Sequence, residues 1–355
     1  MLTSLATASF GVLLVVFVLA GGAVWLAGIR LSETTDALSI RWGLGHALAG
    51  LTLLAIATDL PEVAIVASAA AQGDLGIAIG NLLGGVAIQT AVLAVLDAAG
   101  SRGREPLIFR ASSLVLVIEG ALVIALLAVP VMGSQLPPAL LAGRVTPDGV
   151  LTIGVWVTGI WLVARSRRGL PWNDHGAAPG SASAGCACPE DAWVPRAAPA
   201  PVRLPAATFA LAAGVTLVAG AVLEQSGREL AARLGMDGLL FGATVLAAVT
   251  ALPEVSTGLA AVRLGDDQLV VSDVFGGNAF LPVLLVLGTA LSGKSAVAAT
   301  GASDLYLTGL GILLTVIYCW ALIVRPRRQV LGMGIDSFVV LVLYILGIAG
   351  LATLL

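Results

Sequence analysis

Two copies of one 36-residue stretch constrain this chain more than any other feature. Residues 52–87 and 244–279 align without a gap at a shift of 192, and 14 of the 36 aligned positions are identical. The identical positions include a Thr, a Leu-Pro-Glu-Val run, a Gly-Asp pair and a Gly-Gly pair: Thr58/Thr250, Leu60–Val63/Leu252–Val255, Gly73-Asp74/Gly265-Asp266 and Gly84-Gly85/Gly276-Gly277. Chance similarity between apolar segments would match Leu, Val and Ala instead. An internal repeat with interrupted helices in corresponding halves predicts a secondary transporter.

Composition places the chain in a lipid bilayer. Hydrophobic residues make up 58% of its 355 positions and charged residues only 11%, whereas soluble domains carry about 25% charged residues. We therefore expect an integral membrane protein whose partner is the bilayer and not nucleic acid. The oligomeric state stays open. Three cysteines, Cys186, Cys188 and Cys319, are too few for a disulfide framework.

Apolar runs that are long enough to cross hydrocarbon predict ten helices. They lie at 8–29, 44–71, 75–97, 111–132, 149–164, 205–224, 237–262, 269–291, 304–324 and 336–355. The expected fold is an all-α integral membrane protein with about ten transmembrane helices, arranged as two inverted five-helix repeats. The first repeat covers 1–165 and the second covers 205–355. Residues 166–204 are rich in Pro, Ala, Gly and Ser, which predicts a flexible cytoplasmic linker.

The distribution of basic residues predicts the orientation. Loops that follow odd-numbered helices hold 14 Arg residues, and the opposite side holds four basic residues: Arg144, Arg228, Arg233 and Lys294. Basic loops face the cytoplasm, so both termini are expected outside the cell membrane. Each half has five helices, an odd number, and the two halves therefore enter the bilayer in opposite senses. The two Pro-Glu segments then approach the midplane from opposite faces.

Each Pro-Glu pair predicts a site for a hard cation. Pro61 removes the backbone donor for the carbonyl of Ala57, so carbonyl oxygens near Ala57 and Thr58 are freed. Irregular backbone at membrane depth is tolerated where it lines a cavity, and a carboxylate there indicates function. Free carbonyls with the Glu62 carboxylate form an oxygen-only site, which Ca²⁺ and Na⁺ prefer. The second repeat has the same residue types at Thr250, Pro253 and Glu254. The alternative for each Pro is a plain kink.

The second part of each repeat carries paired glycines and a polar residue. The glycines let helices pack closely, and they are Gly84, Gly85, Gly276 and Gly277. Asn81 and Asp273 occupy equivalent positions. Asn81 either lines the cavity or caps the broken end of a partner helix, and Asp273, which is costlier to bury, is a candidate ion ligand. Gln89 offers another oxygen, whereas its equivalent Leu281 offers none.

The two segments resemble the α-repeats of the sodium/calcium exchanger superfamily, also called the cation/Ca²⁺ exchangers. The family pattern is G-T-S-L-P-E followed, at the spacing seen here, by G-N-x-x-G-S-N. This chain has A-T-D-L-P-E with G-N-L-L-G-G-V, and V-T-A-L-P-E with S-D-V-F-G-G-N. The resemblance implies a secondary active antiporter, not an enzyme and without a cofactor, that moves Ca²⁺ or a related cation by alternating access. It implies that Glu62 and Glu254 coordinate the divalent ion and that Thr58 and Thr250 supply backbone oxygen.

Departures from the family pattern leave the counter-ion open. The family's first Ser is Asp59 in one repeat and Ala251 in the other, and the Ser of G-S-N is Gly85 and Gly277. Asn278 keeps the family's Asn. Several oxygens that the family uses for Na⁺ are therefore absent. Two carboxylates close together in low dielectric would take up at least one proton when no metal is bound, so a cation/proton antiporter of the same superfamily is the alternative to a Na⁺-coupled one.

Two remote alternatives to a transporter also remain, and three further acidic residues lie in or near the predicted helices. A non-transporting membrane scaffold and an intramembrane hydrolase are possible in principle, although the chain has no HExxH zinc motif. Glu119 is expected to be either an internal hydrogen-bonded group or a residue that supports the ion-binding side chains from behind. Asp97 and Glu224 lie near helix ends and are expected to reach the membrane interface.

Overall fold

A computed structural model describes residues 8–41, 55–101, 104–137, 144–167, 203–298 and 300–354. In these residues eight helices are long and apolar enough to cross a bilayer. They are α2 (Phe10–Arg41), α6 (Gly76–Gly100), α8 (Leu114–Gly133), α9 (Pro147–Arg167), α10 (Arg203–Leu234), α14 (Asp267–Ser292), α15 (Ala302–Val324) and α16 (Ile335–Leu354). The all-helical membrane fold expected from the sequence is confirmed.

The two Pro-Glu segments are broken helices rather than single spans. In the second repeat α11 (Gly238–Phe241), a π-helical turn η3 (Gly242–Leu246) and α12 (Ala247–Thr250) lead into α13 (Leu252–Leu264), and the axis bends by 41° at the break. In the first repeat α4 (Ala55–Thr58) leads into α5 (Leu60–Gln72). The start of the expected helix 44–71 lies outside the described residues, as does most of the linker 166–204, including Cys186 and Cys188.

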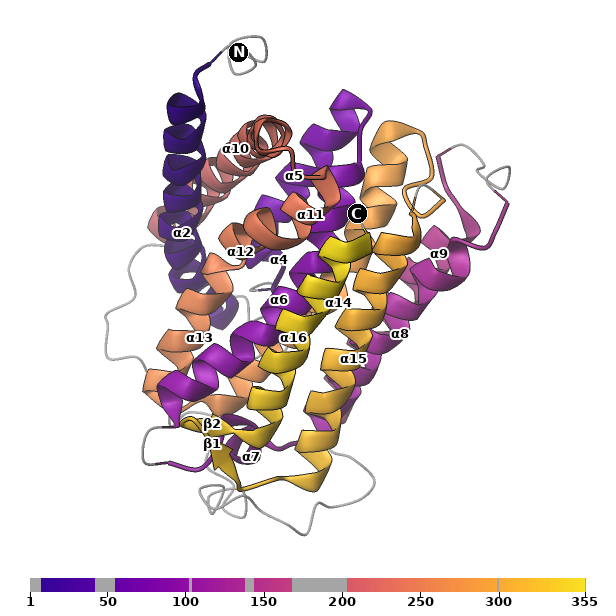
Figure 1. Ribbon diagram of the computed structural model, residues 1–355. Helices are drawn as coiled ribbons and strands as arrows, with labels where there is room; N and C mark the ends of the chain where they lie inside the picture. Colours follow the sequence, from indigo (N-terminus) through magenta and orange to yellow (C-terminus); the bar gives the residue numbers. More distant parts are fainter. Residues whose placement is uncertain are drawn as a thin grey trace.

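The helices form a bundle whose centre is α6 packed against α14. In the apolar window of α6, 89% of the residues are buried, compared with 22% for α16, so α6 belongs to the interior and α16 to the periphery. α2 and α10 pack against each other on one side, and α8, α9, α15 and α16 pack on the other. The start of α2 and the end of α16 lie at the same end of the bundle (Figure 1).

Two elements at the opposite end of the bundle were not expected from the apolar pattern. α7 (Leu107–Ala111) is a single short helix, and β1 (Gln329–Val330) pairs antiparallel with β2 (Met333–Gly334). Arg110 on α7 donates two hydrogen bonds of 2.8 Å to the Asp267 carboxylate at the start of α14. This pairing raises the pKa of Arg110, so the guanidinium stays charged and fastens the first repeat to the second.

Asp97, expected at the membrane interface, is fully buried, so that expectation was wrong. Its Oδ1 accepts a hydrogen bond of 2.7 Å from the backbone N of Leu107, and its Oδ2 accepts one of 2.7 Å from the backbone N of Gly334. Ser101 Oγ also donates to Oδ1. Asp97 at the end of α6 therefore anchors both α7 and the β-ribbon, because several donors replace the water that the carboxylate loses.

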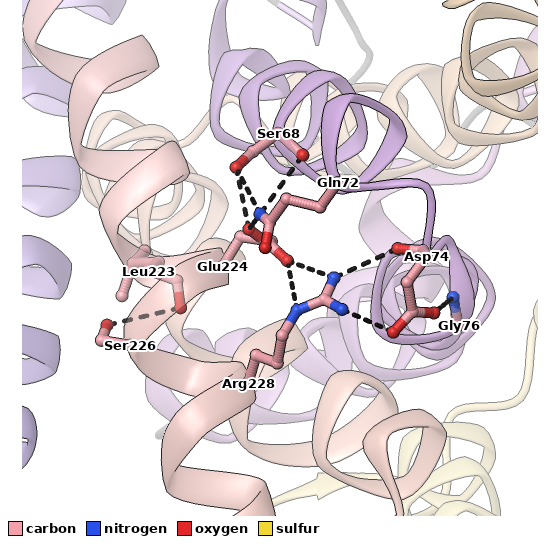
Figure 2. Close-up of polar contacts among 8 residues, drawn as sticks. All are labelled: Ser68, Gln72, Asp74, Gly76, Leu223, Glu224, Ser226 and Arg228. Atoms are coloured by element: carbon pink, nitrogen blue, oxygen red, sulfur yellow. Dashed lines mark hydrogen bonds and ion pairs between the residues drawn. The ribbon is translucent and has the colours of Figure 1, made fainter. Parts of the chain in front are cut away.

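Glu224 on α10 is also fully buried, which corrects the second expectation of an interfacial acid. Figure 2 shows how it joins α10 to α5. Further along α10, Arg233 donates to the carbonyl of Ala8, so this part of α10 lies toward the end of the bundle where α2 begins. Glu224 Oε2 accepts hydrogen bonds from Ser68 Oγ at 2.8 Å and Gln72 Nε2 at 2.6 Å. Arg228 Nη2 lies 2.6 Å from Glu224 Oε1, and Arg228 Nη1 lies 2.5 Å from Asp74 Oδ2. We call these five residues the α5–α10 clamp.

Loss of the guanidinium from the clamp should destabilise the protein strongly. Arg228→Ala leaves the Glu224 carboxylate buried without its counter-charge, and breaking such a pair costs on the order of 3 kcal/mol. The measurement is the thermal unfolding midpoint in detergent. Arg233→Ala is the matched control on the same helix, because its ion pair with Glu229 is partly exposed and should contribute about 0–1 kcal/mol. Equal shifts in the two variants would contradict the role given to the clamp.

Candidate functional site

The two helix breaks have the same backbone geometry in both repeats. Asp59 lies between α4 and α5 with φ −82° and ψ 7°, and Ala251 lies between α12 and α13 with φ −79° and ψ 1°. Pro61 and Pro253 have no N–H, so the carbonyl groups four residues earlier lose their helical donor. The ladder resumes at once, since Val63 N donates to Asp59 O at 3.1 Å. Each break therefore interrupts the helix for about one turn without unfolding the segment, and the ligating role of the carbonyl oxygens there stays a prediction.

Four carboxylates gather at the breaks in the interior of the bundle. Asp59, Glu62, Glu254 and Asp273 are all buried. Glu254 lies within electrostatic range of the other three acids, and Asp59 lies within range of Glu62 and Asp273. Among the described residues, the polar side chains beside these carboxylates are uncharged, with Gln89 next to Asp59 and Thr250 next to Glu62. The buried residues of the described part include no Lys, Arg or His. The arrangement is therefore a group of acids that can stay buried only when protons or bound metal cations neutralise them.

Asn81 on α6 and Asp273 on α14, which occupy equivalent positions in the two repeats, have different hydrogen-bond partners. Thr250 Oγ1 donates to Asn81 Oδ1 at a long 3.4 Å, which joins the two repeats beside the second break. Asp273 Oδ2 accepts a hydrogen bond of 2.7 Å from Thr257 Oγ1 within its own repeat. Asn81 thus contacts the threonine side chain at the break, and no backbone N–H of the described residues donates to its side chain. Thr257 was missed from the sequence, although its position three residues after Glu254 places it on the same helix face.

The site has one polar side and one apolar side. A Cβ placed on Gly277 would lie 3.4 and 3.5 Å from the two Asp59 carboxylate oxygens and 3.6 Å from Gln89 Oε1. At the equivalent position in the other half, a Cβ on Gly85 would lie 3.1 Å from a methyl carbon of Leu281. The space where a side chain on Gly277 would lie is therefore bordered by oxygens, whereas the equivalent space at Gly85 is bordered by hydrocarbon. We call these regions the Asp59 lobe and the Leu281 lobe.

The remaining predicted residues lie around this centre. Thr58 is buried, and its hydroxyl donates to the carbonyl of Ala55 at 3.0 Å. Asn278 Nδ2 donates to Thr90 Oγ1 at 3.0 Å, a partner that was not foreseen, and its Oδ1 is buried without a hydrogen bond in the described residues. Glu119 accepts a hydrogen bond of 2.8 Å from Ser272 Oγ, which confirms it as an internal hydrogen-bonded group. Gly276 and Glu119 border one small apolar cavity.

Glycines bring the backbones around the site into direct contact. A Cβ on Gly80 would lie 2.5 Å from the carbonyl oxygen of Leu239, and one on Gly84 would overlap the backbone of Ala243. α6 therefore packs against the α11–η3 segment of the other repeat with no side chain between them. Gly84, predicted as a packing glycine, lies at this close approach, and the contact fixes Asn81 of α6 beside the second break.

Two further glycines allow the outer helices α2 and α10 to pack directly against the helix breaks. A Cβ on Gly28 of α2 would lie 2.8 Å from Cβ of Pro253, and one on Gly220 of α10 would lie 2.7 Å from the carbonyl oxygen of Pro61. Each outer helix thus covers the Pro-Glu segment of the other repeat. The two glycines are separated by 192 positions, the shift of the repeat itself, so this signal was present in the sequence but lay outside the aligned 36 residues.

Comparison with known families decides the class of protein. The family model described as sodium/calcium exchanger protein matches residues 12–164 and 204–351, which together are most of the chain. The chain belongs to the sodium/calcium exchanger family. This exchanger is a membrane transporter and not an enzyme, so the hydrolase alternative is excluded.

Named relatives and solved structures agree with this assignment. The exchanger is 27% identical over 283 residues to the protein named "Putative antiporter CaxA" of Alkalimonas amylolytica, covering 77% of this chain and 78% of that one. It is 26% identical over 288 residues to the inner membrane protein YrbG of Escherichia coli strain K12, covering 81% and 79%.

Two solved structures share the fold of the exchanger. The structure of an H⁺/Ca²⁺ exchanger named CAX has a TM-score of 0.65 at 13% identity and covers 96% of this chain and 85% of its own. The structure of the sodium/calcium exchanger from Methanococcus jannaschii has a TM-score of 0.57 at 18% identity and covers 95% and 98%.

The close approach of α10 to the first break predicts a strong effect of one added methyl group. Gly220→Ala would push α10 away from Pro61 and should cost about 1–3 kcal/mol of stability. Gly214→Ala on the same helix is the matched control, because a Cβ there meets nothing within 4 Å and alanine favours the helix by about 0.5–1 kcal/mol. Thermal unfolding in detergent measures both. If Gly220→Ala proves as stable as Gly214→Ala, the backbones of α10 and of Pro61 must be further apart than the structure places them.

Proposed function

We propose that this exchanger is a secondary active antiporter that moves Ca²⁺ or a related cation by alternating access at the Glu62–Glu254 pair. The observation that carries the proposal is the group of buried carboxylates at two helix breaks, with no buried basic residue beside them in the described part of the chain. A permanent ligand-free cluster of this charge would be severely destabilising. A transport site resolves the difficulty, because one cation leaves only as another replaces it.

The ligand chemistry fits a hard divalent ion. Ca²⁺ takes about 6–8 oxygen ligands. Glu62 and Glu254 supply carboxylate oxygens, and the carbonyls near Thr58 and Thr250 supply backbone oxygens freed by the breaks. Asp59, Gln89 or water would complete the shell. Asn81, Asp273 and Asn278 surround this centre as further oxygen donors.

The counter-ion is a monovalent cation, and two candidates follow from different observations. Na⁺ follows from the family, whose name couples sodium to calcium. H⁺ is favoured by the Leu281 lobe, because Gly85, Ala251 and Leu281 give a second Na⁺ no side-chain oxygen. Ca²⁺ balances two of the four negative charges, so the remaining acids need monovalent cations in either case. We place the counter-ion in the Asp59 lobe, where carboxylate and amide oxygens face Gly277.

Neutralising either glutamate should abolish Ca²⁺ transport. Glu62→Gln and Glu254→Gln keep the side-chain volume but remove the charge that compensates a dehydrated cation. The measurement is ⁴⁵Ca²⁺ uptake into proteoliposomes under an outward gradient of Na⁺ or H⁺. Glu119→Gln is the control, because its amide oxygen can still accept from Ser272 and it should retain uptake. Full uptake by both glutamate variants would remove them from the site, and a wild-type protein without any flux would support a non-transporting scaffold.

Asp59→Ser should change the coupling of transport. The substitution restores the family residue and removes one acid from the Asp59 lobe. We expect dependence on the H⁺ gradient to fall relative to dependence on the Na⁺ gradient by about tenfold, the effect of roughly 1.4 kcal/mol on one state. Uptake is measured with an outward Na⁺ gradient at fixed pH and then with an outward H⁺ gradient in the absence of Na⁺. Unchanged dependence on both gradients would separate Asp59 from the coupling.

The orientation is part of the same proposal. We place both termini and the α5–α10 clamp outside the cell membrane. The linker 166–204, between repeats 1–165 and 205–355, is placed in the cytoplasm. The reason is that the loops on the linker's side hold 14 basic residues and the loops on the other side hold four. Cys186 and Cys188 should resist an impermeant thiol reagent in intact cells and react after permeabilisation. Cys319 is buried in α15 and should not interfere. Labelling of the two cysteines in intact cells would show that the orientation is the reverse of the one proposed.

A further inference from the structure

The turn between α15 and α16 holds an exposed leucine in an unfavourable backbone conformation. Leu331 and Gly332 join the two strands of the β-ribbon with φ of +53° and +83°. A two-residue hairpin loop with both φ values positive strongly prefers Asn-Gly, because a side chain such as leucine is strained in the left-handed region. Leu331 is also 82% exposed. The described protein leaves this apolar side chain largely uncovered, and an apolar environment outside the protein would stabilise it.

Arginine side chains surround the base of the same turn. The guanidinium carbons of Arg325 and Arg327 lie 5.1 and 4.9 Å from the ring centroid of Phe109, which is itself buried under them. Stacking on the ring restricts these side chains, and the exposed Arg327 keeps the edge of its guanidinium accessible for hydrogen bonds. Arg327 and Arg328 are exposed and form no ion pair with the residues that the structure describes. We call Arg325, Arg327, Arg328 and Leu331 the ribbon patch.

The ribbon patch is held firmly by the rest of the protein. Gly334 N donates to the buried Asp97 carboxylate at 2.7 Å, and Gln329 Nε2 donates to the carbonyl of Arg104 at 2.6 Å. Ile335 N donates to Arg328 O at 3.0 Å and closes the base of the turn. The arginines and the leucine are therefore presented in fixed relative positions, and their arrangement costs little additional ordering when a ligand binds.

The position of the patch matches the headgroup layer of the membrane. α15 ends at Val324 and α16 begins at Ile335, so the patch follows one span and precedes the next. Trp320, one turn before the end of α15, is 63% exposed and is of the type that marks the membrane interface. Phosphate groups of lipids lie at this depth, and arginine forks bind phosphate oxygens in pairs.

We propose that the ribbon patch binds the headgroup of an anionic phospholipid, with Arg327 and Arg328 on the phosphate and Leu331 inserted beside the acyl chains. Insertion gives the exposed leucine an apolar environment and offsets the strain of its backbone. The proposal favours lipid over a soluble acidic partner, because a soluble partner offers no reason for an unpaired leucine at the tip. Asp97 connects the patch to the end of α6, so a bound lipid also stabilises the position of the helix that carries Asn81 and Gln89.

The test is a titration of short-chain phosphatidylglycerol into the full-length protein in neutral detergent, with short-chain phosphatidylcholine as the uncharged comparison. The thermal unfolding midpoint at each concentration gives an apparent Kd. Phosphatidylglycerol should raise the midpoint saturably, with an effect that weakens at high salt. Each arginine near an anionic lipid contributes about 1 kcal/mol, so Arg327→Gln with Arg328→Gln should weaken the apparent affinity by about 30-fold. Arg263→Gln, an exposed arginine elsewhere, is the control and should leave it unchanged.

Leu331→Asn separates lipid binding from the stability of the turn itself. Asparagine suits a positive φ, so this variant should unfold at a higher temperature than the wild type without lipid. It should nevertheless gain less from phosphatidylglycerol, because the inserted side chain is lost. The proposal is overturned if phosphatidylcholine raises the midpoint as much as phosphatidylglycerol does. It is also overturned if the double arginine variant keeps the wild-type affinity, or if Leu331→Asn keeps the full lipid-dependent rise.

Discussion

Repulsion among buried carboxylates is the constraint on which the centre of this exchanger depends. Asp59, Glu62, Glu254 and Asp273 lie together in the interior, and no buried basic side chain of the described chain balances them. Broken helices allow such a group to exist, because their free carbonyls and carboxylates can together replace the hydration shell of a cation. The close glycine contacts at Gly80, Gly84, Gly28 and Gly220 then hold both breaks at the meeting point of the two repeats.

The two halves share a backbone design but differ in chemistry. The Asp59 lobe faces Gly277 with oxygens, while the Leu281 lobe faces Gly85 with methyl groups. The α5–α10 clamp has no counterpart in the other half, since the residues equivalent to Ser68 and Glu224 are Ala260 and Ser32. Inward-open and outward-open states of an inverted repeat would have equal energies if the halves were identical. In the alternating-access mechanism that we propose, both differences would give the two states unequal stability and unequal affinity for monovalent cations.

The sequence predicted the local conformation of the helix breaks, but it did not predict hydrogen bonds between residues that are distant in the chain. The breaks at Asp59 and Ala251 follow from Pro61 and Pro253, because a missing N–H acts within one helical turn. The burial of Asp97 and Glu224 could not be foreseen, since their donors, such as Gly334 and Ser68, come from distant parts of the chain. The β-ribbon escaped notice because an Asn-Gly turn signal is absent at Leu331-Gly332. The ligating roles of the site residues remain predictions.

Equilibrium ⁴⁵Ca²⁺ binding to the purified protein in detergent tests the central claim most directly, because it needs no gradient and no orientation. The account predicts one saturable Ca²⁺ site per chain, competed by Na⁺ or by H⁺, and absent from the Glu62→Gln/Glu254→Gln double variant in its folded form. Saturable binding that survives in the double variant would contradict the claim that the carboxylates at the two breaks hold the transported cation.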